Sequence, residues 1–118
     1  MTQKERREIY DMFGGRCAYC GQSIAYKDMQ IDHIKPIYKG RDNKPNRAGD
    51  NTSDNFFPSC RSCNHRKGTL TIEQFRRELE KAYERLLRDN ATFRIAERYG
   101  LVKRCEKEKV LFLFEKVY

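Results

Sequence analysis

Two pairs of cysteines are the residues of this chain with the most clearly defined chemistry. Cys17 and Cys20 form one C-x2-C pair, and Cys60 and Cys63 form a second pair further along the chain. Thiolate sulfur is a favoured ligand of zinc, and a structural zinc site takes four such ligands in a tetrahedral arrangement. The segment between the pairs is longer than in a compact zinc ribbon. We therefore predict a closed structural zinc site that clamps a hairpin between the pairs, against the alternative of four thiols without a metal.

A second group of polar residues lies between the two cysteine pairs and directly after them. Asp32 and His33 are neighbours, and Asn64 follows the last of the paired cysteines. Carboxylate and amide oxygens are ligands for hard cations such as Mg²⁺ or Mn²⁺. An imidazole changes its charge near neutral pH and therefore suits a general base. This combination of side chains is suited to hydrolysis assisted by a metal ion.

Two short strands are predicted to carry or support these residues. Residues 29–34 favour a strand, and on it Asp32 and His33 would point to opposite faces, because side chains alternate along an extended backbone. Residues 55–57 favour a second strand that ends at Pro58.

Turns, a loop and helices are predicted around the strands. A capping-box pattern, a threonine followed by a glutamate three residues later, opens a predicted helix over residues 2–13. Residues 17–21 are expected to form a zinc knuckle, a tight turn that presents two sulfurs. The polar, turn-rich residues 39–54 predict a long, mobile loop. Residues 61–67 favour a helix that stops at Gly68.

The second half of the chain has a helical pattern and no predicted catalytic residue. Apolar residues at helical spacing predict one helix over residues 71–88. A further short helix is expected to be capped by Asp89 or Asn90 and to run through Arg98. Residues 110–118 are compatible with a buried strand or a helix, and their aromatic and aliphatic content favours the strand.

Length and composition favour one small domain with a charged, basic surface. The 118 residues are 36% charged and carry a formal net charge of +8, which favours a polyanionic partner over the alternative of a generic basic surface. The odd number of cysteines and the absence of an apolar opening segment favour a soluble protein of the reducing cytoplasm, without membrane association. Cys105, outside the pairs, is expected to be a buried or half-buried thiol.

The order of these residues resembles the HNH endonucleases, which are ββα-metal nucleases. The resemblance implies an α+β fold with a small zinc-stapled ββα-metal core over residues 17–68 and flanking helices. We expect a single domain over residues 1–118, in which residues 69–118 form a C-terminal extension. The matching elements are Cys17-x2-Cys20, Asp32-His33-Ile34-x-Pro36, Asn55, and Cys60-x2-Cys63-Asn64-x2-Lys67-Gly68.

The resemblance implies a role for each polar residue of the motif. His33 would be the general base that activates water, and Asp32 and Asn64 would hold a catalytic Mg²⁺ or Mn²⁺ ion. Asn55 would hydrogen-bond the backbone near His33 and so orient it. Lys67, three residues beyond Asn64, lies on the same helical face and could reach a phosphate.

Basic residues near the motif are candidates for DNA contacts. Basic side chains of the polar loop and of the predicted 61–67 helix could bind phosphates on either side of the cleavage site. His65 lies one residue off the motif position and is interpreted as a surface residue, against the less favoured alternative of a metal or phosphate contact. The candidate nucleic-acid contacts are Arg41, Lys44, Arg61 and Arg66, with Arg47 beside them.

Three functions are compatible with the sequence. The leading prediction is a metal-dependent endonuclease that hydrolyses phosphodiester bonds of double-stranded DNA and leaves 5′-phosphate and 3′-hydroxyl ends, as the family does. One site per chain would nick one strand, so double-strand cleavage would need a homodimer, a protein partner or two events. The alternatives are a non-catalytic zinc-stapled module that binds nucleic acid and, more weakly supported, a protein-interaction domain.

Overall fold

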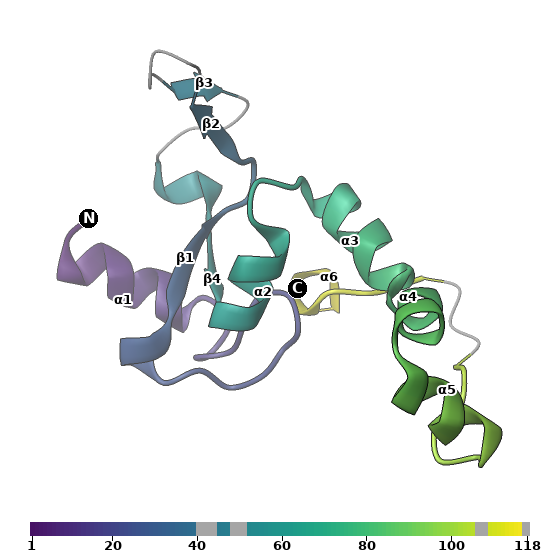
Figure 1. Cartoon of the computed structure of the whole chain (residues 1–118). Helices are drawn as coiled ribbons and strands as arrows, with labels where there is room; N and C mark the ends of the chain where they lie inside the picture. Colours follow the sequence, from purple (N-terminus) through teal and green to yellow (C-terminus); the bar gives the residue numbers. More distant parts are fainter. Residues whose placement is uncertain (40–44, 48–51, 106–108, 117–118) are drawn as a thin grey trace. The chain divides into compact units, whose positions relative to one another are not determined.

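The computed structural model describes residues 1–39, 45–47, 52–105 and 109–116. Contacts within the chain divide it into two compact units (Figure 1). Unit 1 consists of Met1–Ile72 together with Leu111–Tyr118, and unit 2 consists of Glu73–Val110. None of the helices in the described ranges combines the length and apolar content needed to cross a membrane.

A ββα arrangement forms the centre of unit 1. Strands β1 (Gln30–His33) and β4 (Phe56–Ser59) pair antiparallel, and helix α2 (Arg61–Lys67) follows β4 directly (Figure 1). In the register of the pair, His33 lies opposite Phe56. The fold is α+β with a small ββα core and flanking helices, as predicted.

Helix α1 (Gln3–Asp11) leads into the zinc knuckle. The predicted capping box is present: the side chain of Thr2 accepts a hydrogen bond from the amide of Glu5, whose side chain bonds the amide of Thr2. The helix ends two residues earlier than predicted. The knuckle that follows ends at Gly21, whose φ of 80° lies in the left-handed region that favours glycine.

Strand β4 and the predicted loop differ from the sequence-based expectation. Pro58 lies inside β4 opposite Ile31 and does not end the strand. A two-stranded sheet consists of edge strands, and an edge tolerates the missing N–H of a proline. Asn55 belongs to a 3-10 turn, η2 (Ser53–Asn55), rather than to the strand. Another 3-10 turn, η1 (Tyr26–Asp28), precedes β1.

Part of the predicted loop is a hairpin. Strands β2 (Ile37–Lys39) and β3 (Pro45–Arg47) pair antiparallel. The prediction of a loop over all of residues 39–54 was therefore wrong, because backbone pairing between strands does not require an apolar pattern in the sequence. Arg41 and Lys44, two candidate DNA contacts, lie outside the described residues.

Three helices account for most of residues 72–98. They are α3 (Ile72–Glu80), α4 (Ala82–Asp89) and α5 (Ala91–Arg98). The prediction of one helix over 71–88 was wrong: the chain turns at Lys81, although neither glycine nor proline lies there to indicate a break. Of the two predicted caps of α5, Asn90 is the one observed: its side chain accepts a hydrogen bond from the amide of Phe93 at 3.0 Å.

The C-terminal segment returns to unit 1. Its residues form a short helix, α6 (Leu113–Lys116), so the preference for a strand was wrong. Two backbone hydrogen bonds join its start to the knuckle, from the amides of Leu113 and Phe114 to the carbonyls of Tyr19 and Ala18, at 3.0 and 2.9 Å. These bonds to a segment distant in sequence take the place of a strand partner, which the sequence pattern could not specify. Cys105, predicted to be at least half-buried, is exposed.

Candidate active site and zinc cluster

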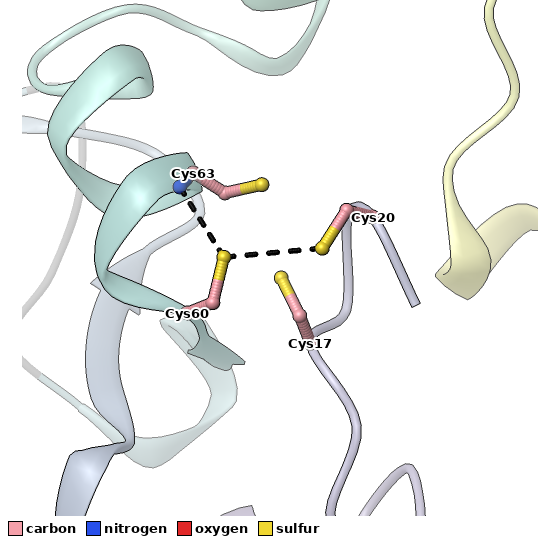
Figure 2. Close-up of side chains that lie close together, drawn as sticks. All are labelled: Cys17, Cys20, Cys60 and Cys63. Carbon is pink, nitrogen blue, oxygen red and sulfur yellow. Dashed lines mark hydrogen bonds between the residues drawn. The ribbon is translucent and has the colours of Figure 1, made fainter. Parts of the chain in front are cut away.

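The four paired cysteines converge from two elements (Figure 2). Cys17 and Cys20 come from the knuckle, and Cys60 and Cys63 come from the start of α2, where the Cys60 sulfur caps the helix by accepting a hydrogen bond from the amide of Cys63. All four sulfurs lie within 4.8 Å of one another, and those of Cys20 and Cys60 are 3.8 Å apart. In a tetrahedral site with Zn–S bonds of about 2.3 Å, sulfurs are about 3.8 Å apart. The cluster therefore fits a structural zinc ion.

Electrostatics within the cluster also favours a cation. A hydrogen bond with Cys63 lowers the pKa of the Cys17 thiol to about 4, while the same contact raises the pKa of Cys63. Burial raises the pKa of Cys20. Ionisation of the Cys17 thiol thus makes ionisation of the neighbouring thiols less favourable, because negative charges this close repel one another. A zinc ion would neutralise them and allow all four to ionise.

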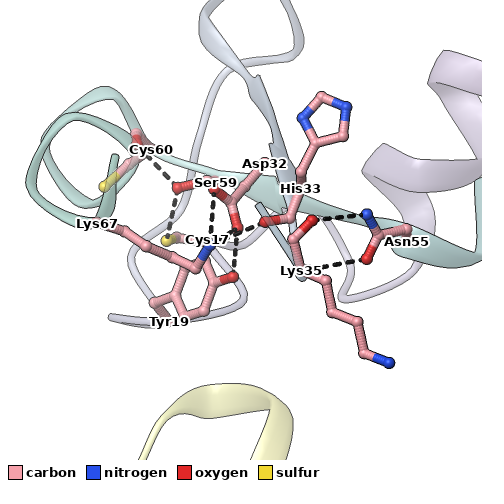
Figure 3. Close-up of polar contacts among 9 residues, drawn as sticks. All are labelled: Cys17, Tyr19, Asp32, His33, Lys35, Asn55, Ser59, Cys60 and Lys67. Carbon is pink, nitrogen blue, oxygen red and sulfur yellow. Dashed lines mark hydrogen bonds and ion pairs between the residues drawn. The ribbon is translucent and has the colours of Figure 1, made fainter. Parts of the chain in front are cut away.

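Asp32 lies on the inner face of β1, in a buried polar group (Figure 3). Its side chain is 3% exposed, and Oδ2 accepts a hydrogen bond of 2.5 Å from the hydroxyl of Tyr19. The ammonium group of Lys67, which is 0% exposed, lies 3.1 Å from Oδ2 and 3.4 Å from Oδ1. Lys67 also donates to the carbonyl of His33 at 2.8 Å. Asp32 and Lys67 therefore form a buried ion pair that also holds the backbone of His33.

The buried environment changes the titration of this group. Burial raises the pKa of Asp32, and the hydrogen bond from Tyr19 and the positive charge of Lys67 oppose that shift without cancelling it. Burial and the neighbouring carboxylate raise the pKa of Tyr19, which consequently keeps its proton and acts as a donor.

His33 lies on the other face of β1. Its ring points away from Asp32, Tyr19 and Lys67 (Figure 3) and packs edge-on against the ring of Phe56, with centroids 5.1 Å apart. The side chain is partly exposed. The alternation predicted for Asp32 and His33 is thus observed, with the carboxylate inside and the imidazole towards solvent.

Asn55 holds the chain just beyond His33. Its Oδ1 accepts a hydrogen bond from the amide of Lys35 at 2.9 Å, and its Nδ2 donates to the carbonyl of Lys35 at 3.0 Å (Figure 3). The backbone carbonyl of Asn55 also accepts from the amide of Ile34 at 2.9 Å. These three bonds fix the path of residues 34–35 and hence the end of the strand that carries His33.

The other predicted site residues lie on α2. Asn64 is partly buried, whereas Arg61, His65 and Arg66 are exposed. Lys67 was predicted to reach a phosphate, but its ammonium group is enclosed by Asp32 and the His33 carbonyl. In this arrangement, a phosphate contact would require the ammonium group to leave Asp32.

Sequence reasoning did not identify Tyr19 as part of the site. Its hydroxyl reaches Asp32, and its ring packs against Phe57, Phe112 and Phe114, with centroid distances of 6.0, 5.3 and 6.1 Å. The available signal was an aromatic residue with a polar tip placed between two cysteines of the cluster. The partner of that tip depends on the tertiary fold.

The chain resembles known nucleases in sequence. Residues 17–70 match the family model for HNH endonuclease. The CRISPR-associated endonuclease Cas9 of Corynebacterium diphtheriae is 34% identical over 53 residues, which are 45% of this chain and 4% of that protein. YoqL, an SPbeta prophage-derived protein of Bacillus subtilis designated an HNH endonuclease, is 27% identical over 97 residues, covering 75% of this chain and 39% of YoqL. The chain thus spans well under half the length of either relative.

The fold also resembles a solved structure. The crystal structure of the Type II-C Cas9 enzyme from Actinomyces naeslundii aligns with a TM-score of 0.52 over 80% of this chain and 10% of that chain, at 23% sequence identity. At this level of identity the likeness supports the fold alone. The match to the family model identifies an HNH endonuclease domain over residues 17–70, a little under half of this chain, and the cysteine cluster and the ββα core lie within that range.

Proposed function

We propose that this protein is a metal-dependent DNA endonuclease in which His33 is the general base. The observation that carries the proposal is the position of His33: its imidazole is partly exposed, while its own carbonyl is held by Lys67 and the next residues are held by Asn55. A fixed backbone under an accessible imidazole is what proton transfer from a bound water requires.

The divalent metal ion would be held by Asp32 and Asn64. Both offer the oxygen ligands that Mg²⁺ and Mn²⁺ prefer. Among the described residues, Oδ2 of Asp32 has contacts with Tyr19 and Lys67, and Oδ1 has the longer contact of 3.4 Å with Lys67; a carboxylate oxygen has two lone pairs. The donor set therefore fits a hard cation that shares Asp32 with Lys67. When bound, such an ion would neutralise charge on the phosphate.

His33 would accept a proton at a ring nitrogen from the attacking water. The water oxygen would form a bond to phosphorus while the bond from phosphorus to the 3′-oxygen breaks. Solvent would supply the proton to that oxygen, so the products would be a 5′-phosphate and a 3′-hydroxyl end. One such site would nick one strand, and a homodimer or another protein would be needed to cut both strands together.

Double-stranded DNA is the proposed substrate. The net charge of +8 favours a polyanion, and Arg61 and Arg66 are exposed on α2, the helix that carries Asn64. Arg41 and Lys44 stay candidate phosphate contacts from the sequence. Since zinc thiolate sites persist in reducing compartments, we place this activity in the cytoplasm.

A non-catalytic zinc module that binds nucleic acid is the second candidate. It is favoured by the burial of Asp32, whose charge is already offset by Lys67 as in a purely structural ion pair. Such a module would bind DNA in a salt-dependent manner and would not cleave it with any divalent ion.

The two histidines provide a matched test. We expect His33→Ala to lower the rate of supercoiled-plasmid nicking in Mg²⁺ or Mn²⁺ by at least about 100-fold, the usual scale of general-base catalysis. His65→Ala removes an exposed imidazole from α2 and should nick at the wild-type rate. Gel-shift titrations should show unchanged DNA affinity for both variants. Nicking by His33→Ala at the wild-type rate would exclude this mechanism. If the wild-type protein itself binds DNA but does not nick it, the second candidate is favoured.

A further inference from the structure

Tyr19 connects the zinc knuckle to Asp32. Tyr19 lies in the sequence between Cys17 and Cys20, two proposed zinc ligands, and its hydroxyl donates to Oδ2 of Asp32 at 2.5 Å. We propose that Tyr19 is a positioning residue, which orients the Asp32 carboxylate for the divalent metal ion and so couples the zinc knuckle to the hydrolytic site. This inference rests on the proposed function and adds to it a residue at an unspecified position of the HNH motif, within Cys17-x2-Cys20.

The backbone of Tyr19 is fixed by the knuckle. The amide of Cys17 donates to the carbonyl of Gln22 at 2.8 Å, and that of Gly21 donates to the carbonyl of Cys17 at 3.1 Å, which closes the turn. The amide of Ala18 donates to the carbonyl of Pro58 in β4 at 2.9 Å. The residue therefore has a defined position relative to the two-stranded sheet that carries Asp32.

The ring of Tyr19 is fixed by aromatic residues from two other segments. Phe57 contacts it from β4, and Phe112 and Phe114 contact it from the C-terminal segment. The residue is 2% exposed, so its ring has little room to move. A rigid ring holds its hydroxyl in one position, which is within hydrogen-bonding distance of the Asp32 carboxylate.

Tyr19 and Lys67 act on the carboxylate in different ways. Lys67 supplies the charge that offsets Asp32 and also bonds the carbonyl of His33. The hydroxyl of Tyr19 supplies no charge but adds a short, directed bond to one oxygen, Oδ2. Hydrogen bonds to a ligating carboxylate orient it, and their removal typically weakens metal binding by about 10- to 100-fold.

Tyr19→Phe tests the proposal because it deletes the hydroxyl and keeps the ring. The matched control is Tyr26→Phe, which deletes a hydroxyl that donates to the exposed side chain of Gln3 at 3.1 Å in the same unit. The measurements on zinc-loaded protein are zinc content by atomic absorption, Mn²⁺ affinity by calorimetric titration, and plasmid nicking as a function of Mn²⁺ concentration.

We expect Tyr19→Phe to retain its zinc and to bind Mn²⁺ about tenfold more weakly. Its nicking rate should recover when Mn²⁺ is raised about tenfold, whereas Tyr26→Phe should match the wild type in every measurement. Unchanged Mn²⁺ affinity in Tyr19→Phe would overturn the inference, and so would loss of zinc, since Tyr19 would then serve the zinc site alone. If the wild-type protein neither binds Mn²⁺ nor nicks DNA, it is the proposed function that fails.

Discussion

Two ion pairs, one in each unit of this protein, lie in opposite surroundings. In unit 1, Asp32 and Lys67 form an ion pair whose side chains are 3% and 0% exposed. In unit 2, Glu78 and Arg85 form a pair whose side chains are 40% and 45% exposed. A buried pair must be complete, because either charge alone would be very unfavourable, whereas an exposed pair is solvated by water when broken. The buried pair therefore indicates where the sequence maintains a specific geometry.

Aromatic residues show the same contrast. In unit 1, the ring of Tyr19, whose hydroxyl donates to Asp32, packs against three phenylalanines: Phe57, Phe112 and Phe114. In unit 2, an edge-on contact joins Tyr83 and Phe93, both partly exposed. The rings of unit 1 thus pack beside the Tyr19–Asp32 hydrogen bond, whereas the ring contact in unit 2 joins helices α4 and α5.

Replacement of a cluster cysteine should have the largest effect, because the cluster joins the knuckle to the start of α2 and fits a structural zinc ion. We expect Cys60→Ser to lose zinc and to unfold at much lower urea than the wild type, since structural zinc contributes roughly 10 kcal/mol of apparent binding free energy in small domains. Zinc content by atomic absorption and urea titration followed by circular dichroism measure this. Cys105→Ser changes an exposed cysteine outside the cluster and should behave as wild type. Full stoichiometric zinc in Cys60→Ser would contradict the assignment.

Loss of one member of the buried pair should have an intermediate effect. Lys67→Met keeps most of the side-chain volume but leaves the Asp32 carboxylate without its cation. The free energy of unfolding should fall by about 3–5 kcal/mol, measured by urea titration. The double variant Asp32→Asn with Lys67→Met leaves no uncompensated charge and should lose clearly less than the sum of the two single variants. A loss below about 1 kcal/mol in Lys67→Met would show that the pair is not buried in solution.

Loss of the exposed pair should have the smallest effect. The hydrogen bond from Arg85 lowers the pKa of Glu78, but both side chains are solvated. We expect Glu78→Gln to leave the urea midpoint and the zinc content within experimental error of the wild type. If Glu78→Gln shifted the urea midpoint as much as Lys67→Met does, the exposed pair and the buried pair would contribute alike to stability, and the contrast between them would be wrong.

Local sequence signals predicted the elements that depend on neighbouring residues. The limits of α2, from the residue after Cys60 to the residue before Gly68, followed from the cysteine pair and the glycine, and the capping box at Thr2 followed from residue spacing. The alternation of Asp32 and His33 followed from the strand itself. These features require no knowledge of distant segments.

Features that depend on distant segments were not predictable. The partners of Asp32 come from a knuckle 13 residues before it and from a helix 35 residues after it. The C-terminal segment is a short helix because its backbone pairs with Tyr19 and Ala18, which its own aromatic pattern cannot specify. The break at Lys81 interrupts an apolar pattern that continues on both sides, so the periodicity predicted one helix.

The return of the chain to the knuckle has a consequence for how this protein can evolve. Residues 73–110 leave unit 1 after α2 and rejoin it where Leu113 and Phe114 bond the knuckle, so unit 2 is an insertion with two fixed ends. The entropy of closing a flexible insertion grows slowly, by about 0.6 kcal/mol for each doubling of its length. Unit 2 can therefore be lengthened, shortened or exchanged for a different structural unit at little entropic cost, while the knuckle, Tyr19 and the Asp32–Lys67 pair stay unchanged.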